Sequence, residues 1–96
     1  MLSLASVVQA TTDQVSCDLG GETAILHLHS GKYFGLDPMA TRIWQLLAAP
    51  RTLAEVRDIL LAEYDVAADL LERDLLEFLG KLQRAKLIAE VPAAAR

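Results

Sequence analysis

The stretch Lys32-Tyr33-Phe34-Gly35-Leu36-Asp37-Pro38 decides the fold, because the spacing of the apolar residues changes within it. Up to Leu36 the chain has short alternating or apolar runs between turn signals, which is typical of strands. Asp37 is a helix N-cap, and Pro38 takes the first helical position, where its missing N–H costs nothing. The sequence therefore predicts strands before this stretch and helices after it.

Three strands are expected between about residues 14 and 36. Val15 to Leu19 alternates with a period of two, Thr23 to His29 follows, and residues 32–36 form a short third strand. The two connections are Gly20-Gly21 and Ser30-Gly31. Because turns this short join neighbouring antiparallel strands, we expect a three-stranded antiparallel meander.

Three helices are expected, over about residues 38–48, 53–64 and 68–85. The second begins with a capping box, Thr52-x-x-Glu55. The third carries an apolar stripe that would face the core: Leu71, Leu75, Phe78, Leu79 and Leu82. Together these elements predict an α+β domain that resembles a winged helix-turn-helix, with a three-stranded antiparallel sheet followed by three helices.

The domain is predicted to span residues 14–91. Residues 1–13 would precede it as an extended segment, of which residues 4–10 could lie alongside the strands, and residues 86–91 would form an extended end. Residues 92–96 would be a tail. No internal repeat or low-complexity tract indicates a second domain.

The composition narrows the class of protein. The net charge is −4, and 53% of the residues are hydrophobic. This balance argues against nucleic-acid binding, which draws most of its affinity from cationic contacts to phosphates. The single Cys17 permits no internal disulfide, and no segment looks like a signal peptide or a membrane span. We expect a soluble cytoplasmic protein with no membrane partner.

The sequence offers little for catalysis or metal binding. His27 and His29 share a strand face, and Cys17 lies on the expected neighbouring strand. Zinc takes nitrogen and sulfur ligands, but a fourth ligand is missing and the spacing matches no closed site. We expect both imidazoles on the less buried face of the sheet, with Cys17 acting as a small apolar residue. The prediction is a non-enzymatic protein without catalytic residues, metal or cofactor.

The third helix has more apolar residues than one stripe requires. Leu70 and Leu76 fall outside its core face, and Leu76 shares a flank with Asp69 and Arg73. One interpretation is a broad stripe on a thoroughly buried helix. The other is that Asp69, Arg73 and Leu76 form the wall of a groove that holds an extended peptide.

Several motifs of this chain occur together in one family. They are Leu26-His27-Leu28, Gly31-Lys32-Tyr33-Phe34-Gly35-Leu36-Asp37 and Ile43-Trp44-Gln45-Leu46-Leu47. With them, the chain resembles the PqqD-like family, whose members recognise the precursor peptides of ribosomally made natural products. The likeness covers about residues 14–90. Ala67-Ala68 departs from the pattern, because family members often have a polar cap there.

The resemblance implies that the chain binds the leader segment of a precursor peptide. The leader would add as a strand beside residues 32–36 and lie against the third helix. The implied binding residues are Lys32, Tyr33, Phe34, Gly35, Leu36, Asp69, Arg73 and Leu76. In lasso-peptide pathways, which the motif details favour, the implied partners are a leader peptidase and an ATP-dependent cyclase. The alternatives are delivery of a precursor to a radical enzyme in quinone-cofactor biosynthesis and a DNA-binding winged helix.

The residue types in the third strand suit strand addition. An exposed edge strand offers unpaired N–H and C=O groups to another chain. Tyr33 and Phe34 point to opposite faces, so we expect only one of them to line the cleft. Gly35 would let another backbone approach closely. Trp44 is expected in the core. The DNA-binding alternative needs a cationic third helix, but its acidic and basic residues balance.

Overall fold

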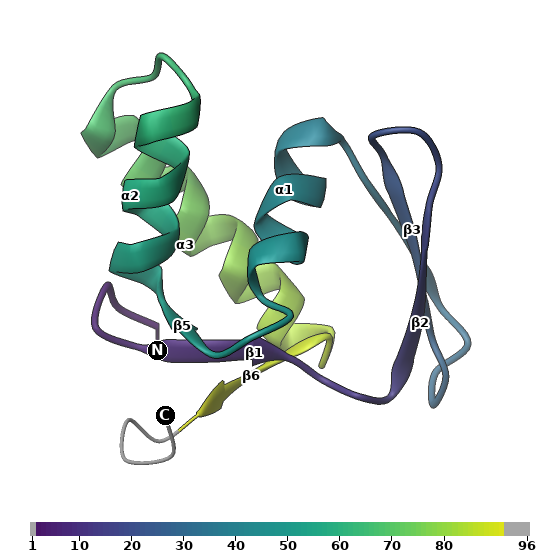
Figure 1. The fold of residues 1–96 in the computed structure, drawn as a ribbon. Helices are drawn as coiled ribbons and strands as arrows, with labels where there is room; N and C mark the ends of the chain where they lie inside the picture. The colour runs from purple at the N-terminus through teal and green to yellow at the C-terminus, as the bar shows by residue number, and fades with distance from the viewer. Residues whose placement is uncertain (1, 92–96) are drawn as a thin grey trace.

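A computed structural model describes residues 2–91; the predicted tail at 92–96 lies outside the described residues. Figure 1 shows two small sheets with three helices packed between and beside them. The strands are β1 (Val7–Ala10), β2 (Gln14–Asp18), β3 (Thr23–His27), β4 (Tyr33–Leu36), β5 (Arg51–Thr52) and β6 (Ile88–Val91). The helices are α1 (Pro38–Leu46), α2 (Leu53–Glu63) and α3 (Ala68–Arg84).

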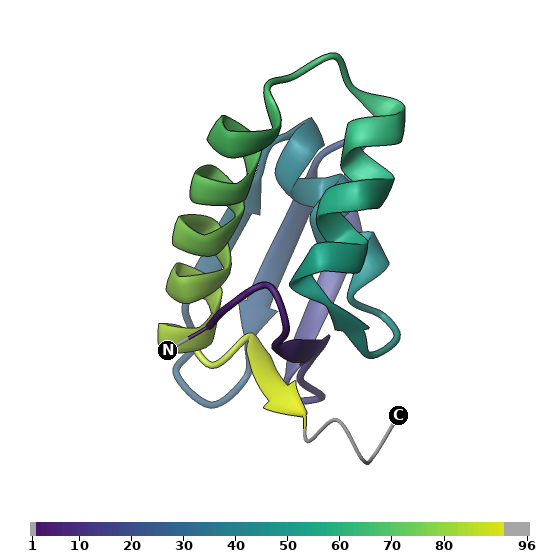
Figure 2. The same cartoon turned by 90° about the vertical axis from the view of Figure 1, so that its left-hand side faces the viewer.

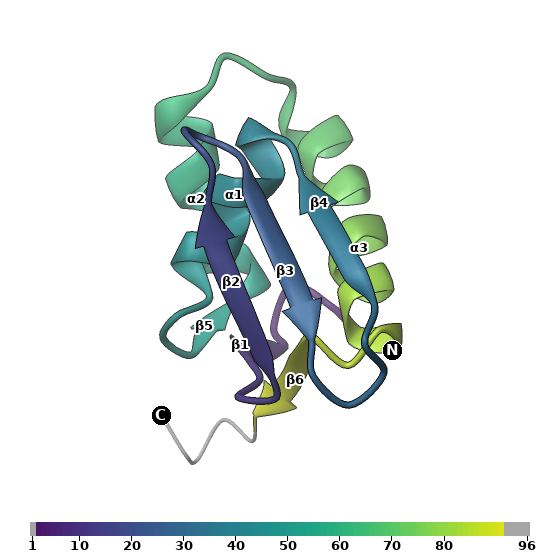
Figure 3. The ribbon, with the colours of Figure 1, turned by 90° about the vertical axis from the view of Figure 1, so that its right-hand side faces the viewer.

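The predicted meander is confirmed as the sheet β2-β3-β4, in which both pairs are antiparallel. Gly20, Gly21 and Gly31 have positive φ angles in its two connections, a conformation that glycine adopts without steric cost. β3 lies in the middle, so β2 and β4 each leave one side without a neighbouring strand of this sheet. Figure 3 shows β4 at the edge that lies next to α3.

The second sheet, in the order β5-β1-β6, was not predicted as a sheet. Residues 1–13 were expected to precede the domain, but β1 is its middle strand and Val8 is fully buried. β6 comes from the extended end predicted at 86–91, and β5 is only two residues long. Since this sheet joins the two ends of the chain, no local period could reveal its pairing.

The helix starts follow their predicted caps. The Asp37 side chain accepts a hydrogen bond from the Ala40 amide at 2.8 Å, and the Thr52–Glu55 capping box is formed. α3 starts at Ala68 without a side-chain cap, because Ala67 precedes it. α1 ends two residues before the predicted position, within the expected variation of helix ends. No helix within residues 2–91 is long and apolar enough to cross a bilayer.

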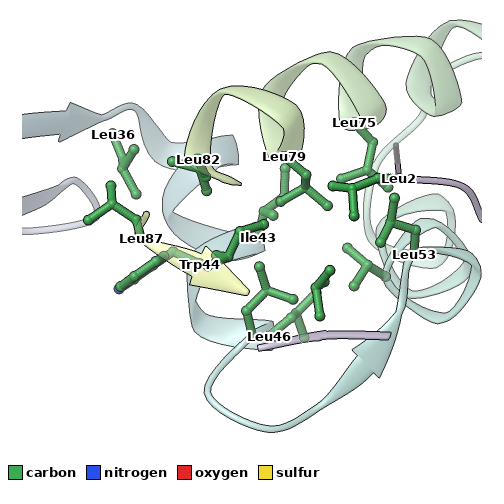
Figure 4. Packing of buried hydrophobic residues seen from close by; sticks show 14 of the residues in the cluster. Leu2, Leu36, Ile43, Trp44, Leu46, Leu53, Leu75, Leu79, Leu82 and Leu87 are labelled. Atoms are coloured by element: carbon green, nitrogen blue, oxygen red, sulfur yellow. The ribbon is translucent and has the colours of Figure 1, made fainter. Parts of the chain in front are cut away.

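The core lies between the helices and the inner faces of both sheets (Figure 4). α3 contributes four buried leucines, at positions 71, 75, 79 and 82, and Trp44 is buried as predicted. α2 and α3 lie side by side in front of the β2-β3-β4 sheet (Figure 2). Arg57 of α2 joins Glu72 of α3 in a salt bridge of 2.6 Å. This salt bridge and the buried leucines therefore join α3 to α2.

The prediction for the faces of β3 was wrong for one histidine. His27 was expected on the less buried face, yet it is only 5% exposed and lies on the core side with Ile25. Its Nδ1 is 2.8 Å from the Ser30 hydroxyl. Alternation shows that the faces differ, but the packed helices decide which one is inside. His29 is exposed, as is Cys17.

Candidate functional site

Among the described residues, no strand pairs with the backbone of β4 on the side away from β3. In an antiparallel pair, consecutive residues point their N–H and C=O groups alternately toward the partner and away from it. The amide of His27 donates to the Lys32 carbonyl at 2.9 Å, so Lys32 faces β3, and Phe34 paired with Ile25 does too. The N–H and C=O groups of Tyr33 and Gly35 therefore point to the open edge.

The same parity holds on the other side of β3, which supports this assignment. The amide of Leu28 donates to the Asp13 carbonyl at 3.0 Å, and the amide of Leu19 to the Glu22 carbonyl at 2.7 Å. Alternate residues of β3 thus bond to β2 and to β4 in turn. On β2, the N–H of Ser16 then points away from β3, just as the N–H of Gly35 does on β4.

A pocket of about 410 Å³ lies along this open edge. We call it the β4–α3 groove. It is lined by all four residues of β4 and by three residues of α3: Tyr33, Phe34, Gly35, Leu36, Phe78, Lys81 and Leu82. One wall is thus a strand with unpaired backbone groups, and the other is an apolar helix flank. A strand-like segment could pair with the first wall and pack against the second.

The two faces of β4 have different surroundings. Phe34 is half-buried and Leu36 is buried, because both point toward the helices. Tyr33 is 76% exposed on the outer face and reaches only the rim of the groove. A Cβ atom added at Gly35 would meet nothing within 4 Å, so a second backbone has room there. Of the two aromatic residues of β4, Phe34 is therefore the one whose side chain lines the inside of the groove.

The helix residues of this groove were not identified from the sequence. Phe78 and Leu82 were assigned to the core stripe, and Lys81 was not assigned to a site. Phe78 is half-buried, Leu82 is buried and Lys81 is exposed, so they step from the core to solvent along one flank of α3. Their spacing of three and four residues was a usable signal for a shared flank. No pattern in the sequence indicates which flank of α3 faces β4.

The three helix residues predicted for the site lie elsewhere. Arg73 and Leu76 line a different pocket of about 500 Å³, together with Gly80 and Leu2. We call it the N-terminal pocket, because Leu2 belongs to the segment that leads into β1. Asp69 is exposed on the first turn of α3. The structure therefore separates Asp69, Arg73 and Leu76 from β4, while Lys32 to Leu36 remain together at the groove.

The groove continues into a further pocket at each end. Beyond Leu36, a pocket of about 260 Å³ shares Phe78 with the groove; it is largely apolar, with Asp37 and Asp74 also in its lining. At the start of β4, a pocket of about 460 Å³ shares Phe34 and Lys81 with the groove. Together the three pockets follow the full length of β4.

The site contains little reactive chemistry. Within residues 2–91 no three His, Cys, Asp or Glu side chains are grouped so that they could hold a metal ion. The shifted pKa values belong to ion pairs away from the groove: hydrogen bonding to Arg42 lowers the pKa of Glu63, and hydrogen bonding to Glu72 raises that of Arg57. What the groove offers is a backbone edge and an apolar wall.

Comparison with known proteins identifies the family of this chain. A search of curated proteins found no match. Among solved structures, the chain resembles TbiB1 in complex with the TbiA(beta) leader peptide, with 37% identity and a TM-score of 0.81 over 88% of this chain and 98% of that one. It also shares the fold of a lasso peptide synthetase B1 complexed with the leader peptide, at 23% identity and a TM-score of 0.75 over 85% of this chain and 96% of that one. Residues 22–88 match the family described as Coenzyme PQQ synthesis protein D (PqqD). The chain belongs to the PqqD family.

Proposed function

We propose that this protein binds the leader segment of a ribosomally made precursor peptide as an added strand on β4. The observation that carries the proposal is the open edge of β4, which faces a groove closed by an apolar flank of α3. Backbone pairing gives affinity in such complexes, and side-chain pockets give specificity. The likeness to TbiB1, whose structure contains a leader peptide, supports the same role here.

The contacts of the bound leader follow from the alternating direction of the backbone N–H and C=O groups along β4. Its backbone pairs with Tyr33 and Gly35, the two residues whose N–H and C=O groups point outward. Its inward side chains pack on Phe34 and Phe78, and Lys32 and Leu36 mark the two ends of the paired stretch. The proposal keeps the predicted strand residues and replaces the predicted helix residues with Phe78, Lys81 and Leu82.

The bound leader is then presented to other proteins for processing. We propose a non-catalytic role in lasso-peptide biosynthesis, with a leader peptidase and an ATP-dependent cyclase as the acting enzymes. A second candidate is delivery of a precursor to a radical enzyme of quinone-cofactor biosynthesis, which the family's description favours. Both roles share the capture step. Reconstitution with each enzyme class would separate them, since only the correct enzyme is accelerated by this protein.

Amide hydrogen exchange tests the capture step directly. The probe is the synthetic TbiA(beta) leader peptide, added to the isotopically labelled full chain. In the free protein we expect the amides of Tyr33 and Gly35 to exchange faster than those of Phe34 and Leu36, which bond to β3. The peptide should slow exchange at Tyr33 and Gly35 selectively. Protection confined to another edge or to the N-terminal pocket would contradict strand addition on β4.

A further inference from the structure

Four of the nine Lys and Arg residues of this acidic chain line a single pocket at one end of the groove. We call it the basic pocket. Lys32 comes from the β3–β4 connection, Lys81 and Arg84 from the last turns of α3, and Lys86 from the turn that follows. Arg84 also lines the N-terminal pocket, so it is shared by the two pockets. His27 and His29 also line it, whereas no carboxylate of residues 2–91 does. The fold thus gathers cations from three segments that are separate in sequence.

These cations have no anionic partner among residues 2–91. The salt bridges of the described chain involve Arg42, Arg57 and Arg73, and none involves a residue of the basic pocket. The C-terminal end of α3 attracts positive charge through its dipole, which accounts for a cation in its last turn. It does not account for Lys32, which lies on the connection to β4.

Lys86 occupies a backbone position that glycine usually fills. Its φ is 63°, and two hydrogen bonds close the end of α3: Lys86 N–H to the Gln83 carbonyl and Leu87 N–H to the Leu82 carbonyl, each 3.0 Å. This is the pattern of a Schellman motif, in which the left-handed residue is most often glycine. A lysine there accepts backbone strain and adds its charge to the basic pocket.

We propose that the basic pocket binds carboxylate side chains of the captured peptide, so that the protein selects leaders with Asp or Glu beside the segment paired with β4. This inference rests on the proposed function. The pocket is continuous with the β4–α3 groove through Phe34 and Lys81. The opposite end of the groove carries Asp37 and Asp74. An acidic stretch placed there would be repelled, so the charges favour one placement of the peptide.

Because the groove has a basic end and an acidic end, the direction of β4 predicts where the acidic residues lie in the peptide sequence. β4 runs from Lys32, at the basic pocket, toward Leu36 and Asp37 at the acidic end. A peptide added antiparallel, like both existing pairs of this sheet, runs the opposite way. Its acidic residues therefore follow the paired segment toward the peptide's C-terminus. Exposed charge pairs each change affinity by only a few-fold, so the preference arises from several cations acting together.

The test selects random peptides, long enough to span the groove and both end pockets, by mRNA display on the immobilised full chain. Wild-type protein should enrich peptides with an excess of Asp and Glu on the C-terminal side of an apolar core. The double variant Lys32→Gln/Lys81→Gln should lose that excess and keep the apolar core. Arg73→Gln is the control for the Lys81→Gln part of the double variant. Both residues are exposed cations on α3, but Arg73 lines the N-terminal pocket.

The affinity is then measured for one enriched acidic peptide and for the same peptide with its Asp and Glu residues replaced by Asn and Gln. The double variant should bind the acidic peptide about tenfold more weakly and the amide peptide equally well, with a difference that shrinks as salt rises. Enriched peptides that bind the groove without an acidic excess would overturn the inference and leave the proposed function standing. If no peptide is enriched, both fail. Displacement of the acidic peptide by a short DNA duplex would assign the pocket to phosphates and overturn the inference.

Discussion

The two flanks of α3 have similar residues in the sequence but lie next to different segments of the folded chain. The flank with Phe78 and Lys81 faces β4, whose backbone is open. The flank with Arg73 and Leu76 faces the N-terminal segment, which reaches it through Leu2. Each flank combines a half-buried apolar side chain with an exposed cation. A pocket beside a helix therefore suits strand capture only where an unpaired backbone edge forms its other wall.

The largest expected effect comes from placing a charge on the flank that faces β4. Phe78→Glu should weaken leader binding roughly a hundredfold or more, because the buried carboxylate must be desolvated against an apolar peptide side chain. Leu76→Glu is the matched variant on the other flank. We expect both variants to lower the melting temperature, since Leu76 and Phe78 both pack on the core, but only Leu76→Glu to leave the affinity of the folded protein nearly unchanged. Fluorescence anisotropy and thermal melting measure the two quantities.

The opposite result for these two variants would contradict the assignment of the peptide site to the flank of α3 that faces β4. If folded Leu76→Glu protein loses binding while Phe78→Glu protein retains it, the N-terminal pocket is the peptide site, and the groove wall of Asp69, Arg73 and Leu76 predicted from the sequence is restored.

A smaller effect is expected from removing one backbone donor. Gly35→Pro deletes the N–H that points to the open edge and should weaken leader binding about tenfold through the unsatisfied peptide carbonyl. Proline is tolerated on an edge strand where its N–H faces solvent, so the fold should persist. Ser16→Pro makes the same change on β2, the other edge of the sheet, and should leave binding unchanged. Circular dichroism controls for folding, and equal affinities of the two variants would argue against pairing on β4.

The smallest expected effect concerns the exposed charge on the flank away from β4. Arg73 is 3.7 Å from Asp74, and both side chains are well exposed. Arg73→Glu should change leader affinity by less than about threefold, because exposed charges that do not line the groove contribute little and are screened by salt. Anisotropy titrations at low and high salt measure this. A large, salt-sensitive loss would place the peptide across both flanks of α3.

Much of the fold could be predicted because its signals are local. The Asp37-Pro38 start, the Thr52–Glu55 capping box and the two glycine turns each involve only a few neighbouring residues. The β5-β1-β6 sheet could not be predicted in the same way, because Val7 pairs with both Thr52 and Val91. The alternating pattern of β3 also could not predict which of its faces is buried, as His27 shows. Alternation gives two faces, and the rest of the fold chooses between them.

The candidate site divides along the same line. The β4 segment, its two aromatic residues and the glycine that leaves room for a second backbone could be read from the sequence, since they depend on residue type and a period of two. The flank of α3 that faces this strand, and the meeting of four scattered cations at one end of the groove, follow from the folded chain alone. This is because a helix buries its apolar stripe and leaves both flanks accessible. What covers each flank depends on strands more than 30 residues away in the chain.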